Sequence, residues 1–146
     1  SIGQGKVQMT PMHLNMITSA IANDGVLMRP YLVDRIETAT GVEYHTYKSK
    51  EYGRLMSSEE SAVLRELMTA VVEQGTANRL KGYGYTAAGK TGSAEYNSLG
   101  DSHAWFTGFA PAEEPEIAIT VIIESAGAGG DYAVPIARRV LDAYFK

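Results

Sequence analysis

The 146-residue sequence contains no cysteine, so it forms no disulfide bond and offers no thiol nucleophile. It has no apolar run long enough to span a bilayer and no recognisable signal peptide. The net charge is -4 and the lysines and arginines do not cluster, which argues against a nucleic-acid-binding surface. The lack of cysteine fits an extracytoplasmic bacterial protein and a cytosolic one equally well, so composition leaves the compartment open.

The residues that are present are typical of a folded domain. Hydrophobic residues make up 45% of the sequence and charged residues 21%, and a chain of this length can bury a core. The first residue is Ser1 rather than Met, from which we expect a processed or cut chain. Helical patterns occur together with short, closely connected strand patterns, which predicts an α+β fold with an antiparallel sheet packed with helices.

Residues 1–82 are predicted to hold two helices and a hairpin. After a loop at Gly3, Gln4 and Gly5, Thr10 and Pro11 begin a helix that ends at Gly25. Strands at 31–37 and 42–47 predict a hairpin. Ser57 and Glu60 form a capping box for a helix reaching Gln74. Its predicted core stripe comprises Val63, Leu64, Leu67, Met68, Val71 and Val72.

Residues 83–146 are predicted to form three antiparallel strands and a final helix. The strands are 87–95, 103–110 and 117–123, with a turn at Asn97, Gly100 and Asp101 and another at 111–115. Asp131 is the predicted cap of the last helix, with Pro135 in its first turn. The buried face of that helix is predicted to carry Ile136, Val140 and Tyr144, flanked by Ala137 and Leu141.

The strand 117–123 is nearly all apolar, which is typical of an interior strand with both faces covered. Nothing later in the sequence can pair beyond it. Either the hairpin between Tyr31 and Tyr47 does so, or a partner strand lies outside these residues.

The stretch A-A-G-K-T-G-S-A-E at 87–95 is the candidate binding site. Side chains alternate along a strand, so Lys90 and Gly92 share one face and Thr91 and Ser93 share the other. A ligand that uses the ammonium and both hydroxyls must therefore lie along the edge of this strand. A free edge can also accept an extended peptide as an additional strand, and Lys90 would attract a carboxylate.

Two other interpretations of this stretch stand beside the first. An edge lysine among small residues can act only as a guard against aggregation. Gly84, Gly89, Lys90 and Thr91 also fit the spacing of a phosphate loop, which requires a buried strand before it and a helix directly after it. Neither flank of this stretch has that pattern, and a nucleotide-binding domain is accordingly the weakest alternative.

An ordered set of motifs resembles the C-terminal portion of the penicillin-binding protein transpeptidase domain, of the class B, high-molecular-weight type. The motifs are G-Q-G before a T-P helix start, A-N-D-G-V-L-M-R-P, E-Q-G-T-A, A-G-K-T-G-S-A-E and H-A-W-F-T-G-F-A-P. Of the family's three active-site motifs only K-T-G is present, because the sequence contains no S-x-x-K and no S-x-N. The resemblance therefore implies that the acylated serine, its lysine base and the middle-motif serine lie upstream of Ser1.

The resemblance implies roles for four residues. Lys90 would help to bind the carboxylate of the substrate or β-lactam and would tune proton transfer, and the hydroxyls of Thr91 and Ser93 would hold that carboxylate. The backbone N–H of Ser93 would form half of an oxyanion hole. Gly92 would let the acyl-donor peptide lie close. No cofactor and no metal are implied.

The resemblance also implies a setting for the chain. The function would be that of a peptidoglycan D,D-transpeptidase on the extracytoplasmic face of the bacterial membrane, acting on stem peptides and binding β-lactams. A non-catalytic β-lactam sensor with the same fold is the alternative. The family sheet has five strands, two of them beyond the apolar strand at 117–123. We therefore expect this chain to pair there with the N-terminal part of the same protein or with a second copy.

Overall fold

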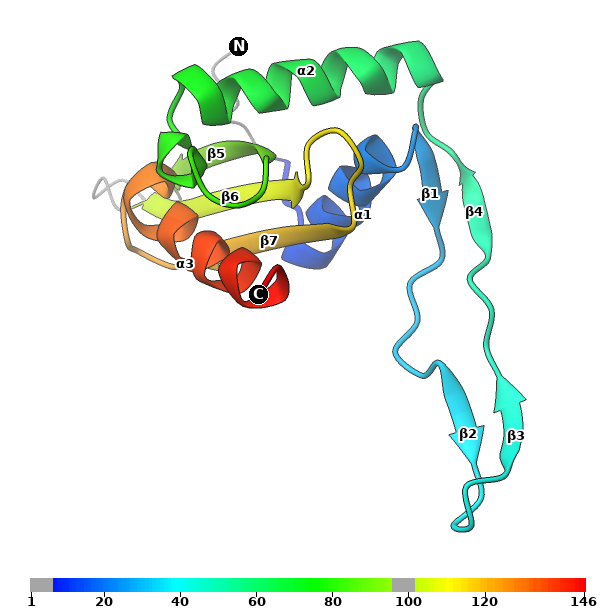
Figure 1. Ribbon diagram of the computed structural model, residues 1–146. Coiled ribbons are helices and arrows are strands. Elements are labelled where there is room, and N and C mark those ends of the chain that lie inside the picture. Colours follow the sequence, from blue (N-terminus) through cyan, green and yellow to red (C-terminus); the bar gives the residue numbers. More distant parts are fainter. Residues whose placement is uncertain (1–6, 96–101) are drawn as a thin grey trace.

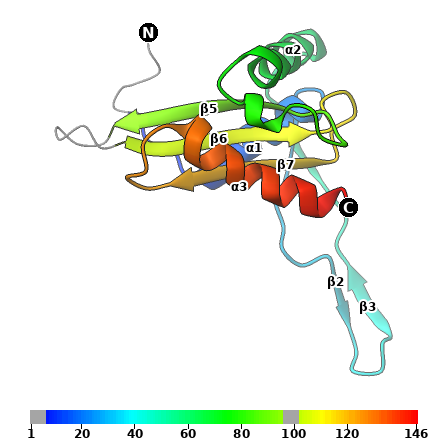
Figure 2. The same cartoon turned by 60° about the vertical axis from the view of Figure 1, so that its left-hand side comes forward.

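The computed structural model describes residues 7–95 and 102–146. The loop expected at Gly3, Gln4 and Gly5 and the turn expected at Asn97, Gly100 and Asp101 lie outside these ranges. A three-stranded sheet carries helix α1 on one face and helix α3 on the other, and helix α2 runs along one side (Figures 1 and 2). Within the described ranges, none of the helices combines the length and apolar character that crossing a bilayer requires.

Helix α1 (Pro11–Ala22) begins and ends as the sequence predicts. The Thr10 side chain accepts a hydrogen bond of 3.2 Å from the backbone N–H of His13. At the other end Gly25 has φ +81°, the left-handed conformation that glycine adopts most easily, and its N–H donates to the carbonyl of Ala20 at 2.8 Å.

Helix α2 (Ser58–Gln74) has the predicted capping box and ends at the predicted glycine. The backbone N–H of Ser57 donates to the Glu60 carboxylate at 2.8 Å, and that of Glu60 donates to the Ser57 hydroxyl at 3.2 Å. The predicted stripe is only partly buried: Val63 and Leu67 are 55% and 59% exposed. The apolar stripe is wider than the surface of α2 that contacts the sheet, so Val63 and Leu67, at its outer margin, point away from the sheet. A short 3-10 helix, η1 (Asn78–Leu80), follows.

The sheet consists of β5 (Ala88–Glu95), β6 (Ser102–Ala110) and β7 (Ile117–Ile123), antiparallel and in that order. The three predicted strands and their order are confirmed, with β5 at one border. Every residue of β7 is half-buried. Helices α1 and α3 cover its two faces, but its outer edge has no partner among the described strands.

A two-stranded ribbon extends away from the sheet (Figure 1). Strands β2 (Arg35–Glu37) and β3 (Glu43–Thr46) form the predicted hairpin, although β2 is shorter than predicted. Strands β1 (Val26–Met28) and β4 (Glu51–Arg54) pair at its base, which was not predicted. Because this ribbon belongs to separate sheets, the suggestion that the hairpin pairs beyond β7 is wrong.

Helix α3 (Gly129–Tyr144) differs from the prediction in its start and in its buried face. It begins two residues before Asp131, which lies inside the first turn and does not cap the helix; Pro135 lies beyond the first turn. The predicted face of Ile136, Val140 and Tyr144 is 41–52% exposed. The buried residues are Gly129, Ala133, Val134, Ala137 and Leu141, so the two predicted flanking residues, Ala137 and Leu141, are buried while the three larger ones are not. The small alanines at the buried face allow the helix to approach the sheet closely.

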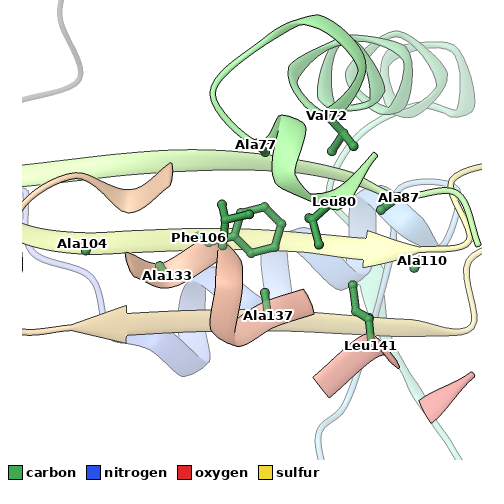
Figure 3. Close-up of a cluster of buried hydrophobic side chains, with 11 residues drawn as sticks. Val72, Ala77, Leu80, Ala87, Ala104, Phe106, Ala110, Ala133, Ala137 and Leu141 are labelled. Carbon is green, nitrogen blue, oxygen red and sulfur yellow. The ribbon is translucent and has the colours of Figure 1, made fainter. Parts of the chain in front are cut away.

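The main core lies between α3 and the sheet and joins side chains from both halves of the chain (Figure 3). Phe106 is its largest buried member, at 1% exposure. Two glycines face each other in register on the same side of the sheet, Gly89 on β5 and Gly108 on β6. A Cβ atom would lie 2.5 Å from the ring of Phe106 if added to Gly89, and 2.7 Å from it if added to Gly108. The ring therefore occupies space that these two glycines leave free.

The tyrosines after η1 anchor their loop to the end of α3 and lie apart from Lys90. The Tyr85 hydroxyl donates to the carboxylate of Asp142 at 2.9 Å, and its ring stacks on Phe145 with centroids 4.9 Å apart. The guanidinium of Arg138 lies 3.7 Å above the ring of Tyr83. Both tyrosines therefore anchor the loop to α3, and both also line a hollow of about 440 Å³ beside η1.

We expect Tyr85 to ionise at higher pH than an exposed tyrosine. Burial, followed by the hydrogen bond to Asp142, raises the pKa of Tyr85 above its ordinary value near 10. The raised pKa means that this anchor stabilises the folded state at neutral pH and is lost as the pH rises through the pKa of folded Tyr85. Ultraviolet titration of the Tyr85→Phe variant should lack one late-ionising tyrosine, and a Tyr83→Phe variant serves as the control. Loss of an early-ionising group would contradict this assignment.

Candidate functional site

Lys90 lies on the α1 side of β5, at the border of the sheet, in a pocket of about 560 Å³. The side chain is exposed, and its ammonium donates a hydrogen bond of 2.7 Å to the carbonyl of Thr91. The pocket is lined by Val7, Met9, Leu14, Lys90, Thr91, Gly92, Ser93, Ala94, Trp105 and Thr107. It is therefore a largely apolar hollow lined by one cation and three hydroxyl-bearing residues, Thr91, Ser93 and Thr107.

Thr91 and Ser93 also line a second hollow, of about 330 Å³, formed with η1 and the start of α3. The hydroxyls of Thr91 and Thr76 are 2.5 Å apart. The hydroxyl of Ser93 accepts a hydrogen bond of 3.4 Å from the backbone N–H of Gly129, the first residue of α3. The two hollows share Thr91 and Ser93, so a ligand along the β5 border can reach both hydroxyls and the ammonium of Lys90.

The start of α3 is held directly against β5 and β6. A Cβ atom on Gly129 would lie 2.2 Å from the carbonyl oxygen of Trp105 and 2.6 Å from that of Gly92. Only glycine permits this approach, which places the positive end of the helix dipole beside Ser93. Gly92 itself is also tightly placed, because its Cβ would lie 3.3 Å from the Cβ of Trp105.

Two other cationic side chains follow α2 in the sequence, and each has an acidic partner. Arg79 forms an ion pair of 2.7 Å with Asp131, in the first turn of α3. Lys81 pairs with Glu73 at 2.9 Å. Lys90 forms no ion pair with any other described residue, so its charge is available to an anionic group at the β5 border.

The phosphate-loop interpretation is wrong. After Thr91 the chain continues as strand β5 to Glu95 and does not enter a helix, and the sheet is antiparallel. Within residues 7–95 and 102–146, no group of three histidine, aspartate or glutamate side chains is placed to hold a metal ion.

Sequence reasoning located Lys90, Thr91, Gly92 and Ser93 but missed the residues that complete the two hollows. Thr76 directly follows the C-cap glycine of α2, and a hydroxyl just after a helix end was the available signal. The contributions of Thr107 and Gly129 come from register and from helix packing. No local pattern in the sequence indicates them.

An antiparallel sheet between helices, with a Lys-Thr-Gly strand at its border, is the arrangement expected of a serine transpeptidase that reacts with penicillin. The family model described as the penicillin binding protein transpeptidase domain matches residues 1–142, and the chain belongs to this family.

Curated relatives agree with this assignment. The chain is 36% identical over 151 residues to the peptidoglycan D,D-transpeptidase PbpA of Mycolicibacterium smegmatis, covering 98% of the chain and 30% of the relative. It is 32% identical over 163 residues to the peptidoglycan D,D-transpeptidase MrdA of Haemophilus influenzae, covering 98% of the chain and 25% of the relative. The chain thus spans a third or less of the length of these relatives.

Solved structures agree on the fold. The imipenem acyl-enzyme complex of penicillin-binding protein A from M. tuberculosis superposes with a TM-score of 0.88 at 35% identity, covering 99% of this chain and 33% of that one. The penicillin G acyl-enzyme complex of the same protein superposes with a TM-score of 0.88 at 34% identity, covering 99% of this chain and 34% of that one. The predicted fold class is confirmed: the chain is part of a penicillin-binding transpeptidase fold.

Proposed function

We propose that this chain is the C-terminal segment of a peptidoglycan D,D-transpeptidase, which cross-links stem peptides through an acyl-enzyme and is acylated by β-lactams. The observation that supports this most directly is the border of β5, where Lys90, Thr91 and Ser93 face two adjoining hollows. The names of the relatives and the acyl-enzyme structures of penicillin-binding protein A support the same activity. We call the full-length protein that contains these residues the parent protein.

In this proposal the chain binds and orients, and a serine elsewhere in the parent protein reacts. The serine oxygen forms a bond to the carbonyl carbon of the stem peptide or β-lactam, and the C–N bond then breaks, with a proton passing to the leaving nitrogen. The backbone N–H of Ser93 is one donor to the oxyanion, and the N–H of the reacting serine is the other. Lys90 attracts the ligand carboxylate, the Thr91 and Ser93 hydroxyls hold it, and Gly92 keeps the strand border open to the peptide.

The unpaired edge of β7 supports a second part of the proposal, that the parent protein supplies the neighbouring strands. The backbone groups of that edge have no strand partner among the described residues. Ile117, Ile119, Val121 and Ile123 of β7 are half-buried and pack against the core. Covering this edge with two strands from the start of the domain would complete a five-stranded sheet. The parent protein would act at the extracytoplasmic face of the bacterial membrane.

Covalent labelling tests the proposed function. The parent protein should react with a fluorescent penicillin to give a labelled band that survives denaturation, whereas the isolated 146-residue chain should give none, because it lacks the S-x-x-K serine. A stable band on the isolated chain would overturn the assignment of the nucleophile. Transfer of the acyl group from a stem peptide to an amine acceptor, followed by turnover, identifies the transpeptidase; acylation without turnover would identify a β-lactam sensor.

We expect the isolated chain to self-associate through β7. An apolar strand with a free edge pairs readily with another copy, and pairing would satisfy its backbone N–H and C=O groups. Light scattering of the purified chain should report dimers or larger species. A strictly monomeric sample that melts cooperatively at an ordinary midpoint would contradict the idea that the rest of the domain is needed.

A further inference from the structure

Four polar side chains form a hydrogen-bonded row between α1 and the sheet. The hydroxyl of Thr18 donates to the carbonyl of Leu14 at 2.9 Å and lies 2.6 Å from the hydroxyl of Thr107. The hydroxyl of Thr107 lies 2.7 Å from that of Thr120, which in turn lies 3.2 Å from the side-chain amide of Asn15. Thr18 and Thr107 are almost fully buried, at 1% and 8% exposure.

The hydroxyl of Thr107 contacts two other hydroxyls but has only one proton. In one direction Thr107 donates to Thr18, whose own proton goes to the carbonyl of Leu14, and accepts from Thr120. In the other direction Thr107 accepts from Thr18 and donates to Thr120, whose own proton goes to Oδ1 of Asn15. In both directions Thr107 donates one hydrogen bond and accepts one.

Either direction leaves Thr107 with one free lone pair and no free proton, because its one proton is donated and one of its two lone pairs accepts. Thr107 lies directly opposite Lys90 in the register of β5 and β6, on the same face of the sheet. Side chains at such positions are neighbours, with Cβ atoms about 4.5–5.5 Å apart. Both residues line the 560 Å³ pocket.

We propose that Thr107 is a positioning residue for Lys90, and that its free lone pair accepts a proton of the Lys90 ammonium in the folded parent protein, with or without a ligand. The ammonium has three N–H donors, of which the carbonyl of Thr91 takes one. Thr107 takes a second and leaves the third for the ligand. Because Thr107 has no free proton, it cannot bind the ligand carboxylate itself. The role assigned to Thr107 rests on the proposed function of Lys90.

The test compares three variants of the parent protein. Thr107→Val removes the hydroxyl with little change of shape, and Thr107→Ser restores it. Thr120→Val is the matched control, because it makes the same chemical change at the next position of the row. Without Thr120, the Thr107 hydroxyl still donates to Thr18 and still presents a lone pair to Lys90.

Acylation rates are measured with a penicillin and with its methyl ester, which lacks the carboxylate charge. We expect Thr107→Val to slow acylation by the penicillin about tenfold, as loss of a hydrogen bond to a charged group does. Acylation of Thr107→Val by the ester should slow less than about twofold. The acylation rates of Thr107→Ser and Thr120→Val should stay within about twofold of the wild-type rate. Equal losses for the acid and the ester, or equal losses in Thr107→Val and Thr120→Val, would overturn the proposal.

A crystallographic comparison separates this inference from the proposed function. If no penicillin acylates the parent protein, the proposed function fails, but the position of the Lys90 ammonium still tests the role of Thr107. We expect the ammonium to move away from β6 in Thr107→Val and to stay in place in Thr107→Ser. An unmoved ammonium in both would overturn the inference.

Discussion

Replacing Lys90 by glutamine in the parent protein should slow acylation by penicillin about 10²–10³-fold, the usual cost of removing one electrostatic stabiliser from an acyl-transfer site. Lys90 is exposed in the pocket and forms no ion pair within residues 7–95 and 102–146, so its charge is available to the ligand. Glutamine keeps a polar side chain of similar length but carries no charge. The measurement is the second-order rate constant for labelling by a fluorescent penicillin.

Lys81→Gln is the matched control for this prediction. Lys81 is also an exposed lysine, but it pairs with Glu73 at 2.9 Å and does not line the pocket of Lys90. Its loss should leave the labelling rate within about twofold of wild type, in keeping with the small contribution of exposed ion pairs. A Lys90→Gln variant that labels as fast as the Lys81→Gln control would remove the basis for the proposed site.

Adding one methyl group at Gly129 should both destabilise the parent protein and impair acylation. The new Cβ in Gly129→Ala would meet the carbonyl oxygens of Trp105 and Gly92 at 2.2 Å and 2.6 Å. These are backbone atoms of two paired strands, so the helix must move away or the strands must shift. Overpacking of this kind costs about 1–3 kcal/mol of unfolding free energy, which denaturant titration measures.

Gly84→Ala is the control for the substitution at Gly129, because a Cβ there would meet nothing within 4 Å. Acylation should fall in Gly129→Ala by about tenfold or more, since displacement of a catalytic strand by an ångström has large effects on rate. If Gly129→Ala and Gly84→Ala have the same stability and the same labelling rate, the close seating of α3 on β5 has no functional importance.

The helix ends and strand positions could be predicted from sequence because their causes are local. Thr10 with Pro11, and Ser57 with Glu60, satisfy backbone groups within one turn, and the structure contains both arrangements. The buried face of α3 could not be predicted in the same way. Its sequence offers a large apolar face at Ile136 and Val140 and a small one at Ala133 and Ala137, and the closeness of the sheet decides between them.

The site was predictable to the same extent. Lys90 and its neighbours lie within one strand, and their alternation follows from strand geometry. Thr76 approaches Thr91 only because α2 and η1 return the chain to the border of β5, and Thr107 lies opposite Lys90 only through the pairing of β5 with β6. Both contacts depend on tertiary structure, which the pattern of a single segment does not contain.

The ring of Phe106 packs on the facing pair Gly89 and Gly108, on the side of the sheet opposite to Lys90, and this contact affects the position of Lys90. If β5 slid by one residue along β6, Lys90 would turn to the side of α3, and Thr91 or Gly89, depending on the direction, would take its place opposite Thr107. That slip would also drive a side chain into the aromatic ring, so the misaligned pairing excludes itself. A purely hydrophobic contact on one side of the sheet thereby determines where the positive charge emerges on the other.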